Sequence, residues 1–221
     1  MSLPKHFHRI ERLARLPLQP VTIAKMLEQH SLRDCSVDAR KTATWLRREL
    51  PIRLSHRIYD FMRLPHLVVC NPHIRKVYDA YNTSLESLLD CPEEIKSFED
   101  ENKFAEVLKR QVQEHADVTK FLQQGHRDLS IIAKNDDKFN SFLDKLFLTR
   151  IGNRLLSQHY LQLRTANSSL NGSSSSSRTE SEDEKVVGVV HKFCNPGDIT
   201  RRTALSLTRL CEDVYGVAPV I

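Results

Sequence analysis

Two arginines and one histidine are the residues whose types and spacing suggest chemistry in this sequence. Arg150 and Arg154 lie four positions apart and therefore share one face of a predicted helix. His115 falls on the apolar stripe of the helix predicted before it. Because planar guanidinium groups bind carboxylates through two hydrogen bonds, these residues could form an anion pocket inside a helical bundle. Hydroxyl groups could be added by Tyr81, Ser84 and Thr149.

The same spacing has a second interpretation. The arginines could extend to solvent while the histidine is a hydrogen-bonded core residue. On spacing alone this second interpretation is preferred. The charged residues around Pro51, in the segment 47–54, are likewise interpreted as a solvated helical face.

Other chemical motifs are missing from the sequence. It has no P-loop, no G-x-S-x-G, no glycine-rich loop and no cysteine or histidine pair at zinc-ligand spacing. No pair of carboxylates is singled out for acid–base work. We therefore assign no catalytic residue and no metal ligand within these residues.

Composition limits the classes of partner. The 221 residues carry a net charge of +5, with 33 basic and 28 acidic residues interspersed along the chain. Nucleic-acid binders usually concentrate basic residues on one face, so no nucleic-acid partner is expected. No apolar run is long enough to cross a membrane. Five scattered cysteines without C-x-x-C spacing favour a reducing compartment.

The elements that must position the candidate site are long helices. No proline occurs between Pro92 and Pro196, so helices in this stretch are not interrupted by the strongest helix breaker. Apolar periodicity predicts a four-helix bundle over residues 21–166, with helices at about 37–63, 72–89, 101–133 and 137–163. Pro51 should kink or split the first of them. Residues 1–20 form a basic N-terminal segment, either a weak transit peptide or a basic first helix.

The pattern changes after the bundle. Residues 167–185 are rich in serine and acidic residues and are predicted to be a linker. A strand is predicted at 186–190 and a helix at 196–215, with Gly216 as its C-cap, before the start of another strand. Residues 186–221 are therefore expected to be the incomplete start of an α/β domain.

Three segments resemble a known family. These are R-x-E-L-P-I-R-L at 47–54, E-H-A-D-V at 114–118 and L-T-R-I-G-N-R-L-L at 148–156. They resemble the mitochondrial protein kinases, which comprise the pyruvate dehydrogenase kinases and the branched-chain α-ketoacid dehydrogenase kinase. Details that lean toward the branched-chain enzyme are C-N-P at 70–72, T-R-I-G-x-R at 149–154 and C-E-x-x-Y-G-x-A-P at 211–219.

The resemblance implies a fold and a function. In this family a bundle similar to a histidine phosphotransfer domain precedes a GHKL-type ATP-binding domain. The kinases use ATP and Mg²⁺ in the mitochondrial matrix, where they phosphorylate serines of the E1α subunit of the dehydrogenase complex and inactivate it. They dock on the lipoyl domain of the E2 core, and full-length members form homodimers.

The resemblance also implies a site. The family's bundle holds an allosteric pocket for α-ketoacids, whose residues fall here on Leu54, Tyr81, Ser84, His115, Thr149, Arg150 and Arg154. This agreement with the helical spacing reverses the preference stated above in favour of the anion pocket. His115 is not expected to be a phosphorylation site.

Two departures from the family pattern matter. An isoleucine common in the pocket is Asn153 here, which affects the choice of ligand. The family's magnesium-binding Asn box, catalytic glutamate and glycine-rich ATP lid match positions beyond Ile221. We therefore expect these residues alone to bind no cofactor and to transfer no phosphate. Two functions stay open: the regulatory half of a serine kinase, or a non-catalytic regulator that binds the E2 lipoyl domain or α-ketoacids.

Overall fold

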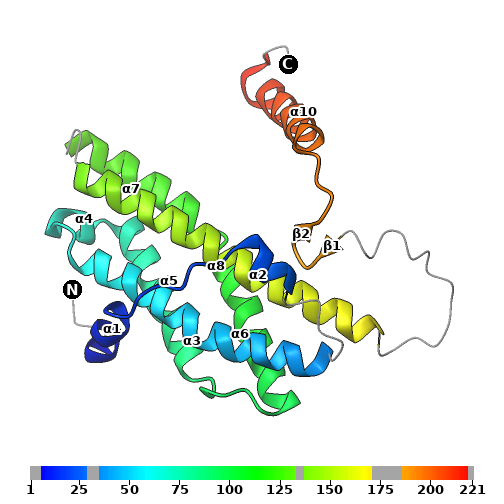
Figure 1. Ribbon diagram of the computed structural model, residues 1–221. Helices are drawn as coiled ribbons and strands as arrows, with labels where there is room; N and C mark the ends of the chain where they lie inside the picture. Colours follow the sequence, from blue (N-terminus) through cyan, green and yellow to red (C-terminus); the bar gives the residue numbers. More distant parts are fainter. Residues whose placement is uncertain (1–5, 29–34, 133–136, 171–185, 219–221) are drawn as a thin grey trace. The chain divides into compact units, whose positions relative to one another are not determined.

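The computed structural model describes residues 6–28, 35–132, 137–170 and 186–218, and most of them are helical (Figure 1). The chain divides into two compact units. The larger unit comprises residues 1–177 together with 187–190, and the smaller unit comprises residues 178–186 and 191–221.

The larger unit is a helical bundle. Its long helices are α3 (Cys35–Met62), α5 (Pro72–Leu89), α6 (Phe98–Glu114), α7 (Val118–Ile132) and α8 (Asp137–Leu170). Helix α3 contacts α5, α6 and α8, while α5 also contacts α6 and α7. Helices α6 and α7 follow each other along the chain and together take the place of one bundle helix. The predicted mainly helical bundle is thus confirmed.

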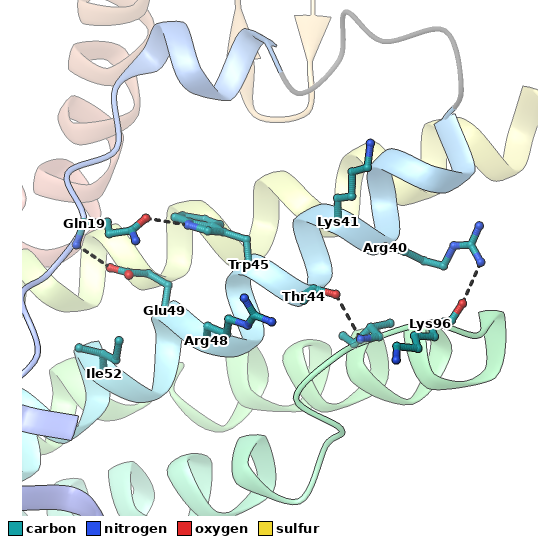
Figure 2. A pocket seen from close by; sticks show the side chains of 10 residues that line it. Gln19, Arg40, Lys41, Thr44, Trp45, Arg48, Glu49, Ile52 and Lys96 are labelled. Carbon is teal, nitrogen blue, oxygen red and sulfur yellow. Dashed lines mark hydrogen bonds between the residues drawn. The ribbon is translucent and has the colours of Figure 1, made fainter. Parts of the chain in front are cut away.

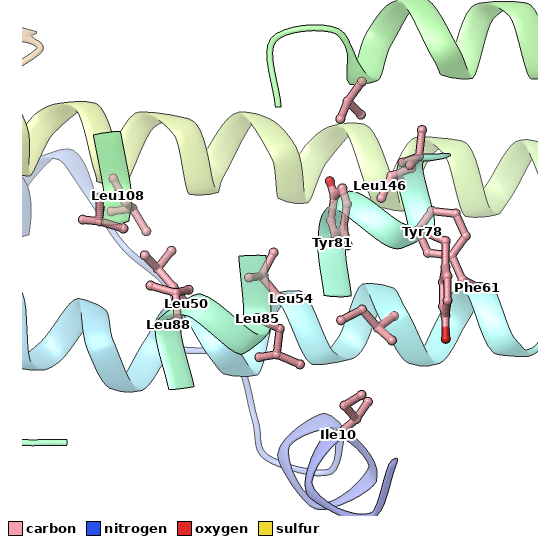
Figure 3. Packing of buried hydrophobic residues seen from close by; sticks show 14 of the residues in the cluster. Ile10, Leu50, Leu54, Phe61, Tyr78, Tyr81, Leu85, Leu88, Leu108 and Leu146 are labelled. Carbon is pink, nitrogen blue, oxygen red and sulfur yellow. The ribbon is translucent and has the colours of Figure 1, made fainter. Parts of the chain in front are cut away.

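Shorter helices complete this unit. They are α1 (Phe7–Ala14), α2 (Ile23–Glu28) and α4 (His66–Cys70). Helix α1 contacts α3, and Figure 3 shows Ile10 pointing toward it. The Ile10 side chain is 1% exposed and belongs to the core. The basic segment 1–20, predicted to lie before the bundle, therefore contributes a packed first helix.

The core between the helices is apolar and rich in leucine. Phe61 of α3 meets Phe142 of α8 edge to face, with ring centroids 4.7 Å apart. Such ring pairs add stability beyond the area they bury. The largest fully buried side chains around them, several of which Figure 3 labels, are Leu46, Leu50, Leu54, Ile58, Ile74, Tyr81, Leu85, Leu88, Phe104 and Tyr160.

Local sequence explains where α5 and α6 begin. The Asn71 side chain accepts hydrogen bonds from the backbone N–H groups of His73 and Ile74, and Pro72 occupies the first helical position. Ser97 forms a capping box with Asp100 at the start of α6. These caps satisfy N–H groups that lack a partner within the helix.

Two helix predictions differ from the structure. Pro51, expected to kink or split its helix, does not split α3, which runs continuously from Cys35 to Met62. The single helix predicted over about 101–133 breaks at residues 115–117, between α6 and α7. That break contains neither glycine nor proline, and Arg150 of α8 donates hydrogen bonds to its backbone, as described below.

The segment after the bundle differs from the predicted single strand. Val186–Val187 (β1) and Val190–His191 (β2) form a two-stranded sheet. Gly188 lies between them at φ +56°, a left-handed conformation that favours glycine. The polypeptide therefore turns back at Gly188 instead of continuing as one strand.

Helix α10 (Pro196–Tyr215) is capped by Asn195 and ends at Gly216, at φ +73°. The prediction of Gly216 as its C-cap is confirmed. Its apolar residues Leu205, Leu207, Leu210 and Val214 are all exposed. The described residues of the smaller unit thus contain one amphipathic helix, and the ATP-binding domain stays a prediction. The serine-rich stretch 171–185 and residues 219–221 lie outside the described residues.

Within the described ranges, no helix combines the length and the apolar character needed to span a bilayer. Nor do those residues bring together three histidine, cysteine, aspartate or glutamate side chains that could hold a metal ion.

Candidate anion site in the helical bundle

A small cavity lies where three bundle helices meet. It is lined by Tyr81 of α5, by residues at the end of α6, and by one face of α8. Its volume is about 20 Å³, room for roughly one water molecule. Its lining residues are Tyr81, Gln111, Val112, His115, Arg150, Asn153, Arg154 and Ser157.

Arg150 explains why α6 stops at this cavity. Its Nη1 donates to the carbonyl oxygen of His115 at 2.5 Å, and its Nη2 donates to that of Ala116 at 3.4 Å. Carbonyl groups at a helix C-terminus lack intrahelical partners and carry partial negative charge. A cation from α8 therefore stabilises the break between α6 and α7.

His115, the C-cap of α6, is held in place by two neighbours on α5. Its Nε2 lies 2.8 Å from the Ser84 hydroxyl, and its ring stacks on Tyr81 with centroids 4.9 Å apart at 24°. Burial lowers the pKa of His115 to about 4; a hydrogen bond to the Ala80 backbone opposes this, and Arg150 reinforces it. At neutral pH the imidazole is therefore uncharged.

The other ionisable groups of the cavity are also shifted. Burial raises the pKa of Tyr81 to about 12, so its hydroxyl stays protonated. Burial lowers the pKa of the Arg150 guanidinium, and the positive charge of Arg154 lowers it further. Because Tyr81 and His115 are both neutral, no lining residue carries a negative charge to balance the two arginines. An anion placed between the two arginines would relieve their repulsion.

The structure brings together only part of the predicted site. Tyr81, His115, Arg150 and Arg154 line the cavity. Ser84 is 3% exposed and reaches the cavity only through His115. Two further predicted residues are not among the lining residues: Leu54, which is fully buried in the apolar core, and Thr149, which is half-buried and precedes Arg150.

Gln111, Val112 and Ser157 line the cavity but were not predicted as site residues. Gln111 lies one helical turn before His115, and Ser157 lies one turn after Arg154, so helical spacing could have found both. Asn153, noted above as a departure from the family, is confirmed as a lining residue. The Gln111 Oε1 and Asn153 Oδ1 atoms are buried and have no hydrogen-bond donor among the described residues.

The size of the cavity sets a condition on binding. A carboxylic acid of five or six heavy atoms needs more than 20 Å³, so side chains must move to admit it. Arg154 is exposed and Arg150 is half-buried. For a carboxylate to bind Arg150, it must replace the backbone carbonyl groups of His115 and Ala116 as that guanidinium's partner.

A larger groove of about 560 Å³ runs along α3 (Figure 2). Its apolar wall is made by Trp45, whose indole donates to Gln19 at 3.0 Å, together with Ile52 and Ile95. Glu49 also lines it and accepts from the Gln19 backbone N–H. Four basic side chains surround the groove: Arg40, Lys41, Arg48 and Lys96.

An apolar cavity of about 420 Å³ adjoins this groove at Gln19, which lines both. Arg53 lies at its edge and forms an ion pair with Glu49, with Nε and Oε1 2.8 Å apart. The rest of the lining is mostly apolar: Leu18, Pro20, Val21, Met26, Leu155 and Leu156.

The solvated-face interpretation of segment 47–54 is wrong for two charged residues. Arg47 is 4% exposed and donates to the carbonyl oxygens of Cys91 at 2.8 Å and Leu89 at 3.0 Å. Glu49 is 2% exposed and pairs with Arg53. Only Arg48 of this group is exposed, with 63% of its side chain accessible.

Comparisons with known proteins agree with this architecture. A model of the family "mitochondrial branched-chain alpha-ketoacid dehydrogenase kinase" matches residues 20–191. A mitochondrial pyruvate dehydrogenase (acetyl-transferring) kinase of Arabidopsis thaliana is 29% identical over 182 residues, which cover 81% of this chain and 46% of that protein. Isozyme 3 of the human mitochondrial pyruvate dehydrogenase (acetyl-transferring) kinase is 28% identical over 225 residues, which cover 96% of this chain and 50% of that protein. The chain thus spans about half the length of the curated relatives it matches.

Proposed function

Because the chain belongs to the family of mitochondrial branched-chain α-ketoacid dehydrogenase kinases, we propose that it supplies the regulatory bundle of a protein-serine kinase. The whole kinase would phosphorylate the E1α subunit of the branched-chain α-ketoacid (or pyruvate) dehydrogenase complex and inactivate it in the mitochondrial matrix. ATP and Mg²⁺ would bind to the α/β domain that residues 186–221 begin. The support is the family match and relatives named as mitochondrial kinases.

The observation that carries the regulatory role is the cavity at the end of α6. Two arginines face a neutral histidine stacked on a neutral tyrosine, so the cavity favours one small anion. The effector we propose is a carboxylate of the α-ketoacid class. Its carboxylate would bind to the guanidinium groups of Arg150 and Arg154, and its side chain would lie toward Val112.

This function is tested by the response of phosphorylation to the effector. The rate of phosphate incorporation into E1α by the whole kinase is measured with and without 2-oxo-4-methylpentanoate, using E1α of each complex. We expect the ratio of the two rates to approach one in Arg154→Ala, while Arg209→Ala, which removes an exposed arginine of α10, keeps the ratio of the unmodified protein. An unchanged ratio in Arg154→Ala would refute the effector site.

A docking role follows from the two adjoining cavities at Gln19. The apolar cavity suits the hydrocarbon part of a lipoyl group, and the basic groove beside it suits an acidic protein surface. The partner we propose is the lipoyl domain of the E2 core. Both binding surfaces lie in the bundle, which also supports the second candidate function, a non-catalytic regulator that binds E2 or the effector.

Docking is tested with exposed residues of α8. Leu155 lines the apolar cavity and is 43% exposed, whereas Ile151 is 64% exposed and does not line it. We expect Leu155→Asp to weaken binding to a lipoylated E2 domain and Ile151→Asp to leave it unchanged, measured by surface plasmon resonance. Equal effects of the two variants would argue against this surface. Docking without phosphate transfer by the whole protein would favour the non-catalytic regulator.

A further inference from the structure

One buried histidine of α8 joins two segments that lie far apart in the sequence. The His159 residue is 2% exposed. Its Nε2 lies 3.2 Å from the backbone carbonyl oxygen of Met26 in α2. Its Nδ1 accepts from the backbone N–H of Val189 at 3.3 Å. One imidazole ring therefore connects α2 with the turn between β1 and β2.

These two partners determine where the ring carries its proton. A backbone N–H only donates and a backbone carbonyl only accepts, so Nδ1 of His159 is unprotonated and Nε2 carries the proton. The other neutral tautomer would lose both hydrogen bonds. Because linked hydrogen bonds polarise one another, the bond to Met26 and the bond from Val189 strengthen each other.

The ring is also packed tightly against the turn. A Cβ added at Gly188 would lie 2.3 Å from His159 Nδ1. Val187, the residue before this glycine, is 1% exposed. Since protein interiors are closely packed, neither the ring nor the turn can shift toward the other without displacing it.

Met26 connects this contact with the apolar cavity of about 420 Å³. Met26 is 3% exposed and lines the cavity, while its backbone carbonyl oxygen faces His159 Nε2. Leu155 and Leu156 of α8 line the same cavity and lie one helical turn before His159. A ligand that packs against these three side chains would hold α2 and α8 in the arrangement in which His159 makes both bonds.

We infer that His159 is a positioning residue that transmits occupancy of the apolar cavity to the β1–β2 turn. A hydrocarbon group in the cavity fixes Met26, His159 keeps both hydrogen bonds, and the Val189 N–H opens to solvent less often. The inference rests on the proposed docking function for the identity of the ligand. It goes further by naming the segment that responds, which leads along the chain to α10.

The test is hydrogen exchange at the Val189 N–H of the full chain, with and without a saturating amount of the lipoylated E2 domain. Exchange of a protected amide measures how often its hydrogen bond opens, and we expect binding to slow it by at least about fivefold at Val189. The matched control is the Ile74 N–H, which donates to the Asn71 side chain at the start of α5. Its exchange rate should not change.

Two variants separate transmission from a merely structural role. The amide of His159→Asn can replace the acceptor Nδ1, and the amide of His159→Gln can replace the donor Nε2, so each variant keeps one of the two contacts. Both should still bind the lipoylated domain, but binding should leave exchange at Val189 unchanged. If His159 only stabilised the fold, exchange in the variants would be faster overall and binding would still slow it.

The other outcomes each decide one point. Binding to the unmodified chain without slower exchange at Val189, or with equal slowing at Ile74, overturns the inference while the docking function stands. Undiminished slowing in either variant also overturns it. If the lipoylated domain does not bind to the folded unmodified chain, the docking function and the inference both fail. Should circular dichroism show that the variants do not fold, the comparison of Val189 with Ile74 in the unmodified chain decides alone.

Discussion

Arg150 of α8 caps the C-terminus of α6 by donating to the carbonyl oxygen of His115, with the two atoms 2.5 Å apart. One side chain thus ends a helix and supplies a charge to the candidate anion site. The two roles are coupled, because a ligand carboxylate must compete with backbone carbonyl groups for the same guanidinium. Arg154 is exposed and does not cap α6, so it is the better residue with which to test binding.

The buried neutral histidine predicts a loss of stability in acid. The pKa of His115 is about 4 in the folded chain and about 6.5 when unfolded. Between these values the unfolded chain binds more protons than the folded chain. The contribution of His115 to stability is therefore complete above pH 6.5 and falls as the pH decreases toward 4. The contribution reaches up to about 3 kcal/mol. Urea unfolding at pH 7 and pH 4.5 should show a smaller difference for His115→Gln than for the unmodified protein.

A buried arginine on α3 should be essential for stability although it is charged. Arg47→Met removes the donors to the carbonyl oxygens of Leu89 and Cys91, at a cost of about 2–3 kcal/mol. Arg48→Met, one residue along, alters an exposed side chain and should change the free energy of unfolding by less than about 0.5 kcal/mol. Chemical denaturation of the pair measures this contrast, and similar values would contradict it.

A buried carboxylate of α6 accepts hydrogen bonds from two residues of α8. Glu101 is 4% exposed and accepts hydrogen bonds from the Tyr160 hydroxyl and from Arg164 Nε, the latter at 3.0 Å. Tyr160→Phe should cost about 1.5–3 kcal/mol, because a charged acceptor loses a donor. Tyr215→Phe, at a residue that is 76% exposed, is the matched control and should be neutral. Thermal unfolding of both variants distinguishes them, and an equally small shift would exclude a structural role for this bond.

Two glycines with positive φ differ in their surroundings. A Cβ at Gly188 would lie 2.3 Å from His159 Nδ1, whereas a Cβ at Gly216 would meet nothing within 4 Å. Gly216→Ala should therefore cost only backbone strain, about 1 kcal/mol, and Gly188→Ala should cost more. It should also speed hydrogen exchange at the Val189 N–H, which donates to His159 Nδ1. Unchanged exchange at Val189 would show that the His159 ring keeps this hydrogen bond and that the added Cβ does not displace it.

The sequence predicted most of the bundle because its signals are local. The Asn71-Pro72 pair marks the start of α5, and Gly216 marks the end of α10, since capping depends on residues close in the chain. The break between α6 and α7 was missed, because it depends on Arg150, which lies 35 positions away in sequence. The helix propensities of the residues near the break do not indicate a contact with a residue so distant in sequence.

The site was predicted in part for the same reason. Helical spacing put Arg150 and Arg154 on one helix face and His115 on an apolar stripe, and the family resemblance then favoured a shared pocket. Neither could show that Leu54 is core or that Thr149 is not a lining residue. The burial of Arg47 did have a local signal. It lies four residues after Ala43 and three before Leu50, on the apolar stripe of α3. A charged residue on such a stripe indicates a buried partner, which here is the end of α5.

We expect the cavity at the end of α6 to bind a small carboxylate through its arginines. The test is calorimetric titration of the unmodified chain and Arg154→Ala with 2-oxo-4-methylpentanoate, with Arg209→Ala as the control. Loss of a hydrogen bond to a charged group costs about 1.5–3 kcal/mol, so affinity for the oxo acid should fall by about 10-fold to 100-fold in Arg154→Ala alone. Equal affinities in all three proteins would contradict the account.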